Sequence, residues 1–324
     1  MQKYTVPSTD LVVSRIAYGC MSLGGAWDDS PLTDREKSAA VQVIMSALEE
    51  GINLFDHADI YAHGKSESAF AEVWREVPDL RRRIILQTKC GIRFAGDPNN
   101  DCPGRYDFDY EHIVNSVHGS LCRLQTDYLD ILLLHRPDPL VEPEEVARAF
   151  DELHASGKVR YFGVSNHTAG QIELLQRSVD QPLVINQVEL NLLHAHLIDE
   201  GIMANQVYGT TALASGTLDY CRQHHILIQA WSPVARGALI NPAPDAERWV
   251  RGAAEAVAGM AAGKNCCAEA IALAWLLRHP GPIQPVIGTA NPQRIAASCQ
   301  ADKIHLTRAE WYSLFVAARG ANVP

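Results

Sequence analysis

The 324-residue sequence has no apolar stretch near the roughly 20 residues that a helix needs to cross a bilayer. Its first ten residues lack the basic region and apolar run of a secretory signal, so we expect a cytoplasmic protein. Basic residues are also in the minority, and the formal net charge is −10. That charge argues against a surface that binds nucleic acid or an anionic membrane, although a few local donors could still hold a phosphorylated cofactor.

The eight cysteines form no CxxC pair, and cysteine and histidine never cluster at the spacing of metal ligands. We therefore expect no bound metal. The neighbouring pair Cys266 and Cys267 is interpreted as a helix packing position, because a free cysteine behaves as a small hydrophobic residue.

Strand-like and helix-like segments alternate along the whole chain, after a short hairpin that turns at residues 7–10. Eight such units without a change in composition predict one domain over residues 1–324, an α/β fold whose parallel strands close into a (β/α)8 TIM barrel. Helices are expected over residues 34–50, 67–77, 110–124, 143–155, 169–178, 217–224, 245–277, 292–298 and 307–318.

Three long loops are expected at the carboxyl ends of the strands, where a barrel forms its active site. They span residues 91–109, 191–216 and 235–245. Long ordered loops are often functional. We expect the second to cover either a cofactor or the entrance for substrate.

Four residues at the ends of apolar runs could together move a proton to an oxygen: Asp56, Tyr61, Lys89 and His135. A free tyrosine is a poor acid at neutral pH, and a nearby ammonium such as that of Lys89 should lower its pKa. Asp56 would keep that lysine charged, and His135 would orient the oxygen that receives the proton. This chemistry suits carbonyl reduction, provided that a hydride donor lies beside it.

Other strand ends carry groups suited to such a donor. Ser165, Asn166 and Gln187 offer hydroxyl and amide groups for a nicotinamide carboxamide, and Trp231 offers a flat face for stacking. A loop entering a short helix carries a set of polar residues and a glycine that could hold a phosphate. These are Gly288, Thr289, Asn291 and Arg294.

These motifs together resemble the aldo-keto reductase superfamily over nearly the whole chain, closest to bacterial members with LLLHRPDPL and NQVE segments. The resemblance implies a barrel that reduces aldehydes and ketones with NADPH and without metal. It implies Tyr61 as the acid, Lys89 and Asp56 as its tuners, and His135 as the orienting group. The cofactor residues it implies are Ser165, Asn166, Gln187, Trp231, Ser232, Thr289, Asn291, Arg294 and Ser298.

The sequence departs from the family pattern around the expected 2′-phosphate site of NADP. Gly288 stands where many members have a lysine, and Ala297 and Ser298 replace the usual Glu and Asn. Preference for NADPH would therefore rest mainly on Arg294, and NADH is expected as a possible secondary cofactor.

Two alternatives from other classes stay open. A barrel of the same family could act as a cofactor-binding sensor with little turnover, although nothing indicates a required protein partner. A metal-dependent hydrolase would use Asp56, His57 and His135, but the first strand ends without the expected ligands. We interpret His57 as structural and leave Asp59 unassigned. Trp27 and Ile92 could line a pocket for hydrophobic aldehydes or sugar-derived ketones.

Overall fold

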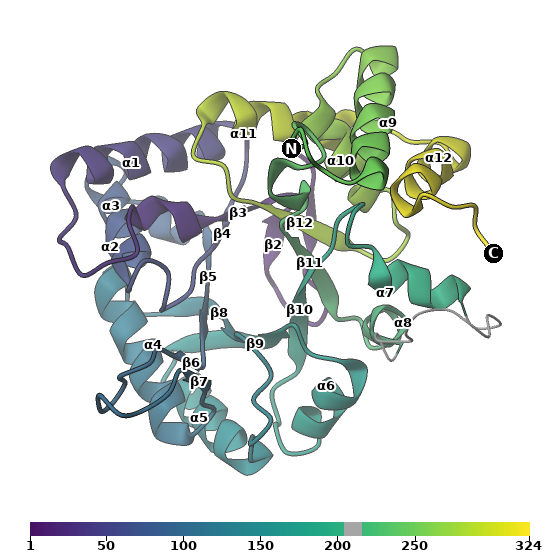
Figure 1. Cartoon of the computed structure of the whole chain (residues 1–324). Coiled ribbons are helices and arrows are strands. Elements are labelled where there is room, and N and C mark those ends of the chain that lie inside the picture. The colour runs from purple at the N-terminus through teal and green to yellow at the C-terminus, as the bar shows by residue number, and fades with distance from the viewer. Residues whose placement is uncertain (204–215) are drawn as a thin grey trace.

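Parallel strands form a closed barrel with helices around it, as the alternating pattern predicts (Figure 1). The computed structural model describes residues 1–203 and 216–324, and every structural statement below refers to these. The barrel strands are β3 (Ala17–Gly19), β4 (Leu54–Asp56), β5 (Ile85–Cys90), β8 (Leu129–Leu134), β9 (Val159–Ser165), β10 (Leu183–Glu189), β11 (Leu227–Trp231) and β12 (Ile283–Ile287). They follow one another around the barrel in chain order, and β12 pairs with β3 to close it.

The α-helices lie outside this barrel. They are α1 (Asp34–Glu49), α2 (Lys65–Ala71), α3 (Val73–Glu76), α4 (Tyr110–Leu124), α5 (Pro143–Ala155), α6 (Ala169–Gln176), α7 (His196–Asp199), α8 (Thr217–Gln223), α9 (Arg248–Lys264), α10 (Ala268–Leu277), α11 (Pro292–Cys299) and α12 (Arg308–Arg319). Short 3₁₀ turns are η1 (Cys20–Gly24), η2 (Leu80–Arg82), η3 (Glu200–Ile202), η4 (Ala235–Gly237) and η5 (Gln300–Lys303). None of the described helices is both long enough and apolar enough to cross a membrane.

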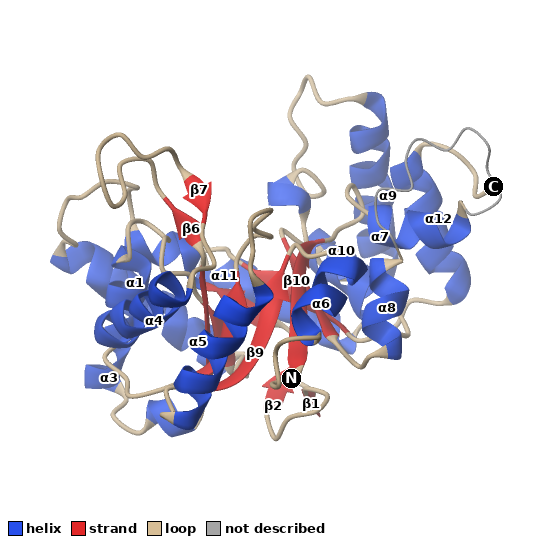
Figure 2. Ribbon diagram, turned by 90° about the horizontal axis from the view of Figure 1, so that it is seen from below, coloured by secondary structure: helices blue, strands red, loops and turns tan. Residues whose placement is uncertain are grey.

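Two antiparallel hairpins lie at opposite ends of the barrel (Figure 2). The hairpin of β1 (Lys3–Thr5) and β2 (Val12–Ser14) confirms the turn expected at residues 7–10. The second hairpin, β6 (Ile92–Arg93) and β7 (Arg105–Tyr106), gives structure to the long loop expected at residues 91–109. Part of the loop expected at 191–216, from residue 204 to 215, lies outside the described residues.

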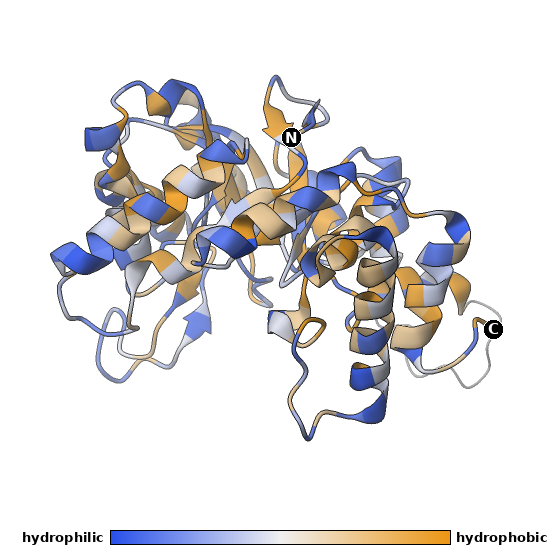
Figure 3. Cartoon of the chain, turned by 90° about the horizontal axis from the view of Figure 1, so that it is seen from above, coloured by the Kyte–Doolittle hydropathy of each residue, from blue (hydrophilic) through white to orange (hydrophobic). Residues whose placement is uncertain are grey.

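The pattern of buried residues explains why the strands and helices could be predicted from the sequence. All six residues of β8 are buried, as expected for a parallel strand covered on both faces. The surrounding helices carry hydrophobic residues among hydrophilic ones along their length (Figure 3), so one side of each can pack on the barrel. The predicted bounds of α4 and α5 are confirmed, and Thr307 caps α12 through the expected capping box with Glu310.

The helical material expected over residues 245–277 forms two helices in the structure, with a break between Lys264 and Ala268. Asn265 adopts a left-handed conformation with φ of 53°, which ends α9 and separates it from α10. Cys266 and Cys267 therefore lie in the turn between two helices and not inside one, and Cys267 occupies the N-cap position of α10. Asparagine tolerates this conformation better than most residues, so the break has a local cause.

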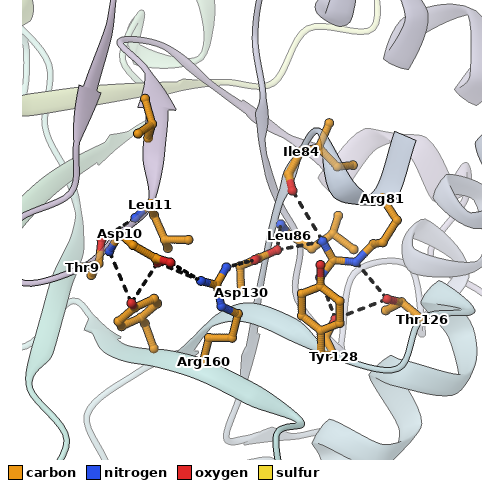
Figure 4. Close-up of polar contacts among 12 residues, drawn as sticks. Thr9, Asp10, Leu11, Arg81, Ile84, Leu86, Thr126, Tyr128, Asp130 and Arg160 are labelled. Atoms are coloured by element: carbon orange, nitrogen blue, oxygen red, sulfur yellow. Dashed lines mark hydrogen bonds and ion pairs between the residues drawn. The ribbon is translucent and has the colours of Figure 1, made fainter. Parts of the chain in front are cut away.

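A network of charges around the buried Asp130 ties the first hairpin to the barrel (Figure 4). Asp130 on β8 is 2% exposed and accepts hydrogen bonds from Arg81 at 2.9 Å, from the Leu86 backbone at 2.9 Å and from Arg160 at 3.0 Å. Arg160 also pairs with Asp10, which lies between β1 and β2, at 2.7 Å. This network therefore joins β5, β8, β9 and the hairpin at the end of the barrel opposite the long loops.

A second group of buried charges lies between the loop after β4 and helix α4. Glu67 is fully buried and accepts hydrogen bonds from Thr88 at 2.6 Å and from Arg123 at 2.8 Å. The nearby Asp59 has a carboxylate oxygen with no hydrogen-bond partner among the described residues. Burial, and then the negative charge of Glu67, raise the pKa of Asp59 to about 7.

Replacement of Asp130 by alanine should lower the free energy of unfolding by about 3 to 5 kcal/mol, because it leaves two guanidinium groups without their shared carboxylate. Urea unfolding measures this loss. The control is Asp79→Ala, which removes an exposed ion pair with Arg82 and should cost less than about 1 kcal/mol. A loss below about 1 kcal/mol for Asp130→Ala would show that the network does not stabilise the barrel.

Asp59→Asn should stabilise the protein increasingly as pH rises. The folded protein holds a proton on Asp59 that the unfolded chain releases above its ordinary pKa of 3.8, so wild-type stability falls as pH rises toward about 7 and the loss is complete above it. At ~1.4 kcal/mol per pKa unit, the advantage of the variant should grow by up to about 3 kcal/mol between pH 5 and pH 7. Urea unfolding across this range tests it, with the exposed Asp79→Asn as control. A pH-independent difference would contradict the shift.

Candidate active site

The four proton-transfer candidates lie at the carboxyl ends of three neighbouring strands. Asp56 ends β4, Lys89 lies near the end of β5, and His135 directly follows β8. Tyr61 belongs to the loop after β4. Because β4, β5 and β8 pair in parallel, their ends meet at one edge, and the four residues come together as the sequence predicts.

A buried ion pair forms the centre of this group. The Lys89 ammonium donates to both carboxylate oxygens of Asp56 at 2.8 Å and to the backbone carbonyl of His57 at 2.7 Å. Lys89 is 1% exposed. Burial opposes its charge, but Asp56 and Tyr61 outweigh that effect and raise the pKa of Lys89 above its ordinary value. The lysine is therefore charged at neutral pH.

Tyr61 lies between this ion pair and His135. Its ring centroid is 5.0 Å from the Lys89 ammonium and 5.9 Å from the ring of His135, which meets it edge-on. Burial raises the pKa of Tyr61, and this effect exceeds the opposing effect of Lys89. The sequence-based expectation of a lowered pKa is thus wrong in its net direction, because desolvation disfavours the phenolate more than one ammonium favours it. Tyr61 is a neutral hydrogen-bond donor.

His135 is also neutral. Burial, followed by the charges of Lys89 and Arg136, lowers its pKa well below the ordinary value. Its Nδ1 atom has no partner in the described part of the chain. A neutral imidazole carries one N–H, so the ring, which meets Tyr61 edge-on, has one hydrogen bond to donate.

His57 has the structural character that we expected. It is fully buried, and its ring meets the ring of Phe70 edge-on at 4.7 Å. Burial lowers its pKa to about 3. A hydrolase built on Asp56, His57 and His135 would need the His57 ring and a free Asp56 carboxylate as ligands, whereas that carboxylate already binds Lys89 through both oxygens.

The groups expected to hold a nicotinamide also come together, next to His135. The Asn166 side chain donates to the Ser165 hydroxyl at 2.8 Å and to the His135 carbonyl at 3.2 Å, and it accepts from the Trp231 indole at 3.1 Å. Ser165 donates to the carbonyl of Gln187 at 2.8 Å. Asn166 has a positive φ of 63°, which turns the chain at the end of β9.

The residues expected to hold the phosphate groups of a cofactor differ in their surroundings, because some are exposed and one is buried. Thr289 and the exposed Arg294 lie at the entrance to α11. Asn291 caps that helix, because its side chain accepts from the backbone of Gln293 at 2.9 Å and of Arg294 at 3.3 Å. Ser298 is 4% exposed, on the buried side of α11.

Ser232 directly follows β11, with a positive φ of 51°. Its backbone carbonyl accepts a hydrogen bond from the Asn191 side chain at 3.0 Å. Asn191, in the loop after β10, is therefore joined to the residue that follows Trp231.

Aromatic and basic groups surround the approach to Tyr61. Trp27 is 48% exposed, and its ring lies 6.4 Å from that of Tyr61. Phe94, also exposed, stacks on His63. The Arg136 guanidinium lies 5.7 Å from the Trp231 ring and has no ion-pair partner among the residues described. Trp27 was expected here, but Phe94 and Arg136 were not.

Three glutamines inside the barrel were not predicted from the sequence. Gln87, Gln229 and Gln284 are fully buried, and Gln87 donates to Asp56 at 2.5 Å. Gln229 and Gln284 are each the single polar residue of an apolar strand, and this pattern is the signal that could have identified them. Gln87 precedes Thr88 and Lys89 in β5 and has no such signal.

Comparisons with known proteins identify the family of this chain. The model of the aldo/keto reductase family matches residues 15–315. The chain is 37% identical over 317 residues to the uncharacterized oxidoreductase YcsN of Bacillus subtilis, with 97% of each chain covered. It is 36% identical over 317 residues to a 6-dehydroglucose reductase of Agrobacterium fabrum, with 98% of each covered.

The fold is similar to the solved structure of a glycerol dehydrogenase from Gluconobacter oxydans, with a TM-score of 0.82 and 25% identity. The alignment covers 99% of this chain and 97% of that one. The match to the family model over nearly the whole chain, together with these relatives, shows that the chain belongs to the aldo/keto reductase family of oxidoreductases, which reduce carbonyl compounds with NAD(P)H.

Proposed function

We propose that this protein reduces an aldehyde to an alcohol with NADPH, and that Tyr61 donates the proton. The observation that carries the proposal is that a neutral tyrosine contacts the Asp56–Lys89 ion pair on one side and a neutral histidine on the other. Bound NADPH supplies the hydride that adds to the carbonyl carbon. The phenolic proton of Tyr61 passes to the carbonyl oxygen, so one hydride and one proton convert C=O into CH–OH.

Each surrounding group has a part in this step. A ring nitrogen of His135 donates to the carbonyl oxygen and places it beside the phenol. Lys89 stabilises the phenolate that Tyr61 becomes, because its ammonium is buried nearby and has little solvent screening. Asp56 keeps that ammonium charged. A proton from solvent then restores Tyr61 for the next turnover.

The described residues fit a nicotinamide cofactor at two places. Ser165, Asn166 and Gln187 would hold the carboxamide, and the half-buried Trp231 would stack on the ring. At α11, Thr289 and the exposed Arg294 would hold the 2′-phosphate of NADPH. The Arg294 guanidinium forms no ion pair in the described structure, so it is available for an anion. Ser232, Asn291 and Ser298 complete the proposed cofactor set.

A sugar-derived aldehyde is the substrate class that we favour. Two relatives, 36% and 34% identical to this chain, are named 6-dehydroglucose reductases. Trp27 offers an exposed aromatic face beside Tyr61, of the kind that packs on the C–H face of a sugar. Arg136 offers unpaired donors for hydroxyl oxygens. A cytoplasmic location and action without a protein partner are also part of the proposal.

Tyr61→Phe should lower kcat for reduction of a reactive aldehyde by about 10² to 10⁴-fold, because it removes the proton donor. NADPH oxidation followed by absorbance measures this, and fluorescence titration should show an unchanged Kd for NADPH. The control is Tyr312→Phe on α12, far from the barrel ends. Parallel titration with NADH measures the preference assigned to Arg294. Tight NADPH binding by wild type without turnover would instead favour the sensor function.

Trp27→Ala should raise KM for glucose oxidised to the aldehyde at C6 by about 10-fold, because stacking of a sugar on an indole is worth roughly 1 kcal/mol or more. KM for propanal, which has no sugar ring, should change less than about 3-fold. Trp249→Ala on α9 is the matched control. Equal effects on both substrates would contradict a role for Trp27 in recognising the sugar.

A further inference from the structure

Four glutamine side chains cross the interior of the barrel. Gln187, Gln229 and Gln284 occupy the same level on β10, β11 and β12, because each is the register partner of the next. Gln87 on β5 reaches them from the other half of the barrel. None of the four is more than 2% exposed. Buried amides are costly unless they are hydrogen-bonded, so their arrangement must satisfy them within the barrel.

The amides form one continuous chain of hydrogen bonds. Gln284 donates to the backbone carbonyl of Ser14 at 2.7 Å, and Gln229 donates to Gln284 at 2.9 Å. Gln229 and Gln87 exchange two bonds, of 2.8 Å and 3.1 Å. Gln187 donates to the same oxygen of Gln229 at 2.9 Å. The chain ends where Gln87 donates to Asp56 at 2.5 Å.

The bond from Gln284 to Ser14 fixes which side of each amide in this series of hydrogen bonds donates and which accepts. A backbone carbonyl can only accept, so Gln284 must present its NH₂ group to Ser14 and its oxygen to Gln229. Gln229 must then donate toward Gln284, which leaves its own oxygen facing Gln87 and Gln187. Gln87 therefore uses one N–H on Gln229 and has the other left for Asp56. Reversing any one amide would bring two oxygens or two NH₂ groups together.

We infer that Gln229 and Gln284 are positioning residues for the reaction, because they fix the orientation in which Gln87 donates to Asp56 and so hold its carboxylate in place. The carboxylate in turn holds Lys89, which faces Tyr61. The same chain joins Asp56 to Gln187, a proposed nicotinamide ligand, through the amides of Gln87 and Gln229. The inference rests on the proposed function in assigning Tyr61 as the acid.

The first test is Gln284→Met, which keeps the length of the side chain and removes the anchoring donor. Gln284 touches neither Asp56 nor the proposed cofactor ligands other than through Gln229. Freed of its anchor, Gln229 can turn, and Gln87 then loses the partner that fixes its donation to Asp56. We expect kcat to fall roughly 10- to 100-fold, the range for loss of a hydrogen bond to a charged group, with KM and the Kd for NADPH changed less than about 3-fold.

The pH profile separates this role from a general loss of packing. The titratable groups that face Asp56 are Lys89, Tyr61 and the Cys20 thiol, and Gln284→Met alters none of them. Loss of the Gln87 donor changes the polar surroundings of Asp56 without changing these groups, so the dependence of kcat on pH should change in Gln284→Met. Thr88→Val is the control. Thr88 is a buried residue of β5 that bonds Glu67 outside the barrel, and its removal should leave the profile unchanged.

A second variant and a measurement without turnover complete the design. Gln229→Met breaks the chain at its centre and should shift the profile at least as far as Gln284→Met. In the wild-type protein, the side-chain NH₂ protons of Gln87 should exchange slowly with solvent by NMR, and in Gln284→Met they should exchange at least 10-fold faster. An unchanged pH profile and unchanged exchange in Gln284→Met would overturn the inference. Slow exchange in a wild-type protein that reduces no carbonyl would instead overturn the proposed function alone.

Discussion

The ion pair between Asp56 and Lys89 is the interaction on which the rest of the site depends. Both groups are nearly inaccessible to solvent, and burying two charges costs several kcal/mol for each ion unless other polar groups replace the lost water. Here the replacements are specific. Lys89 has a carboxylate and a backbone carbonyl, and Asp56 has the ammonium and the amide of Gln87. The barrel supplies this polar shell because the ends of neighbouring parallel strands converge.

The pair also determines the charge state of the residues around it. Lys89 contributes to the lowered pKa of His135 and acts against the raised pKa of Tyr61, but burial is the larger influence on both. The resulting site holds one positive charge, one negative charge and two neutral donors. Such a site is ready to donate to a carbonyl oxygen without first losing or gaining a proton, which is a form of electrostatic preorganisation.

Much of this could be predicted from the sequence because it depends on local patterns. Apolar runs that end in Asp56, Lys89 and His135 gave the strand ends, and the proline and capping signals gave the starts of α5 and α12. The break at Asn265 was missed because one left-handed residue leaves the helical hydrophobic pattern on both sides intact. The direction in which the pKa of Tyr61 shifts could not be predicted, because it depends on how completely the folded chain excludes water from the phenol.

The glutamine chain shows why the remaining part of the site lies beyond local patterns. Gln87 and Gln229 are 142 residues apart in the sequence, and only closure of the barrel makes them partners. Their direction depends on a still more distant carbonyl, that of Ser14, which is the last residue of β2. Both this carbonyl and the Asp130 network connect the β1–β2 segment to the barrel strands. The β1–β2 segment therefore contacts the Asp130 network through Asp10. Through Ser14 it also contacts the amides that reach the proposed site at the opposite end of the barrel.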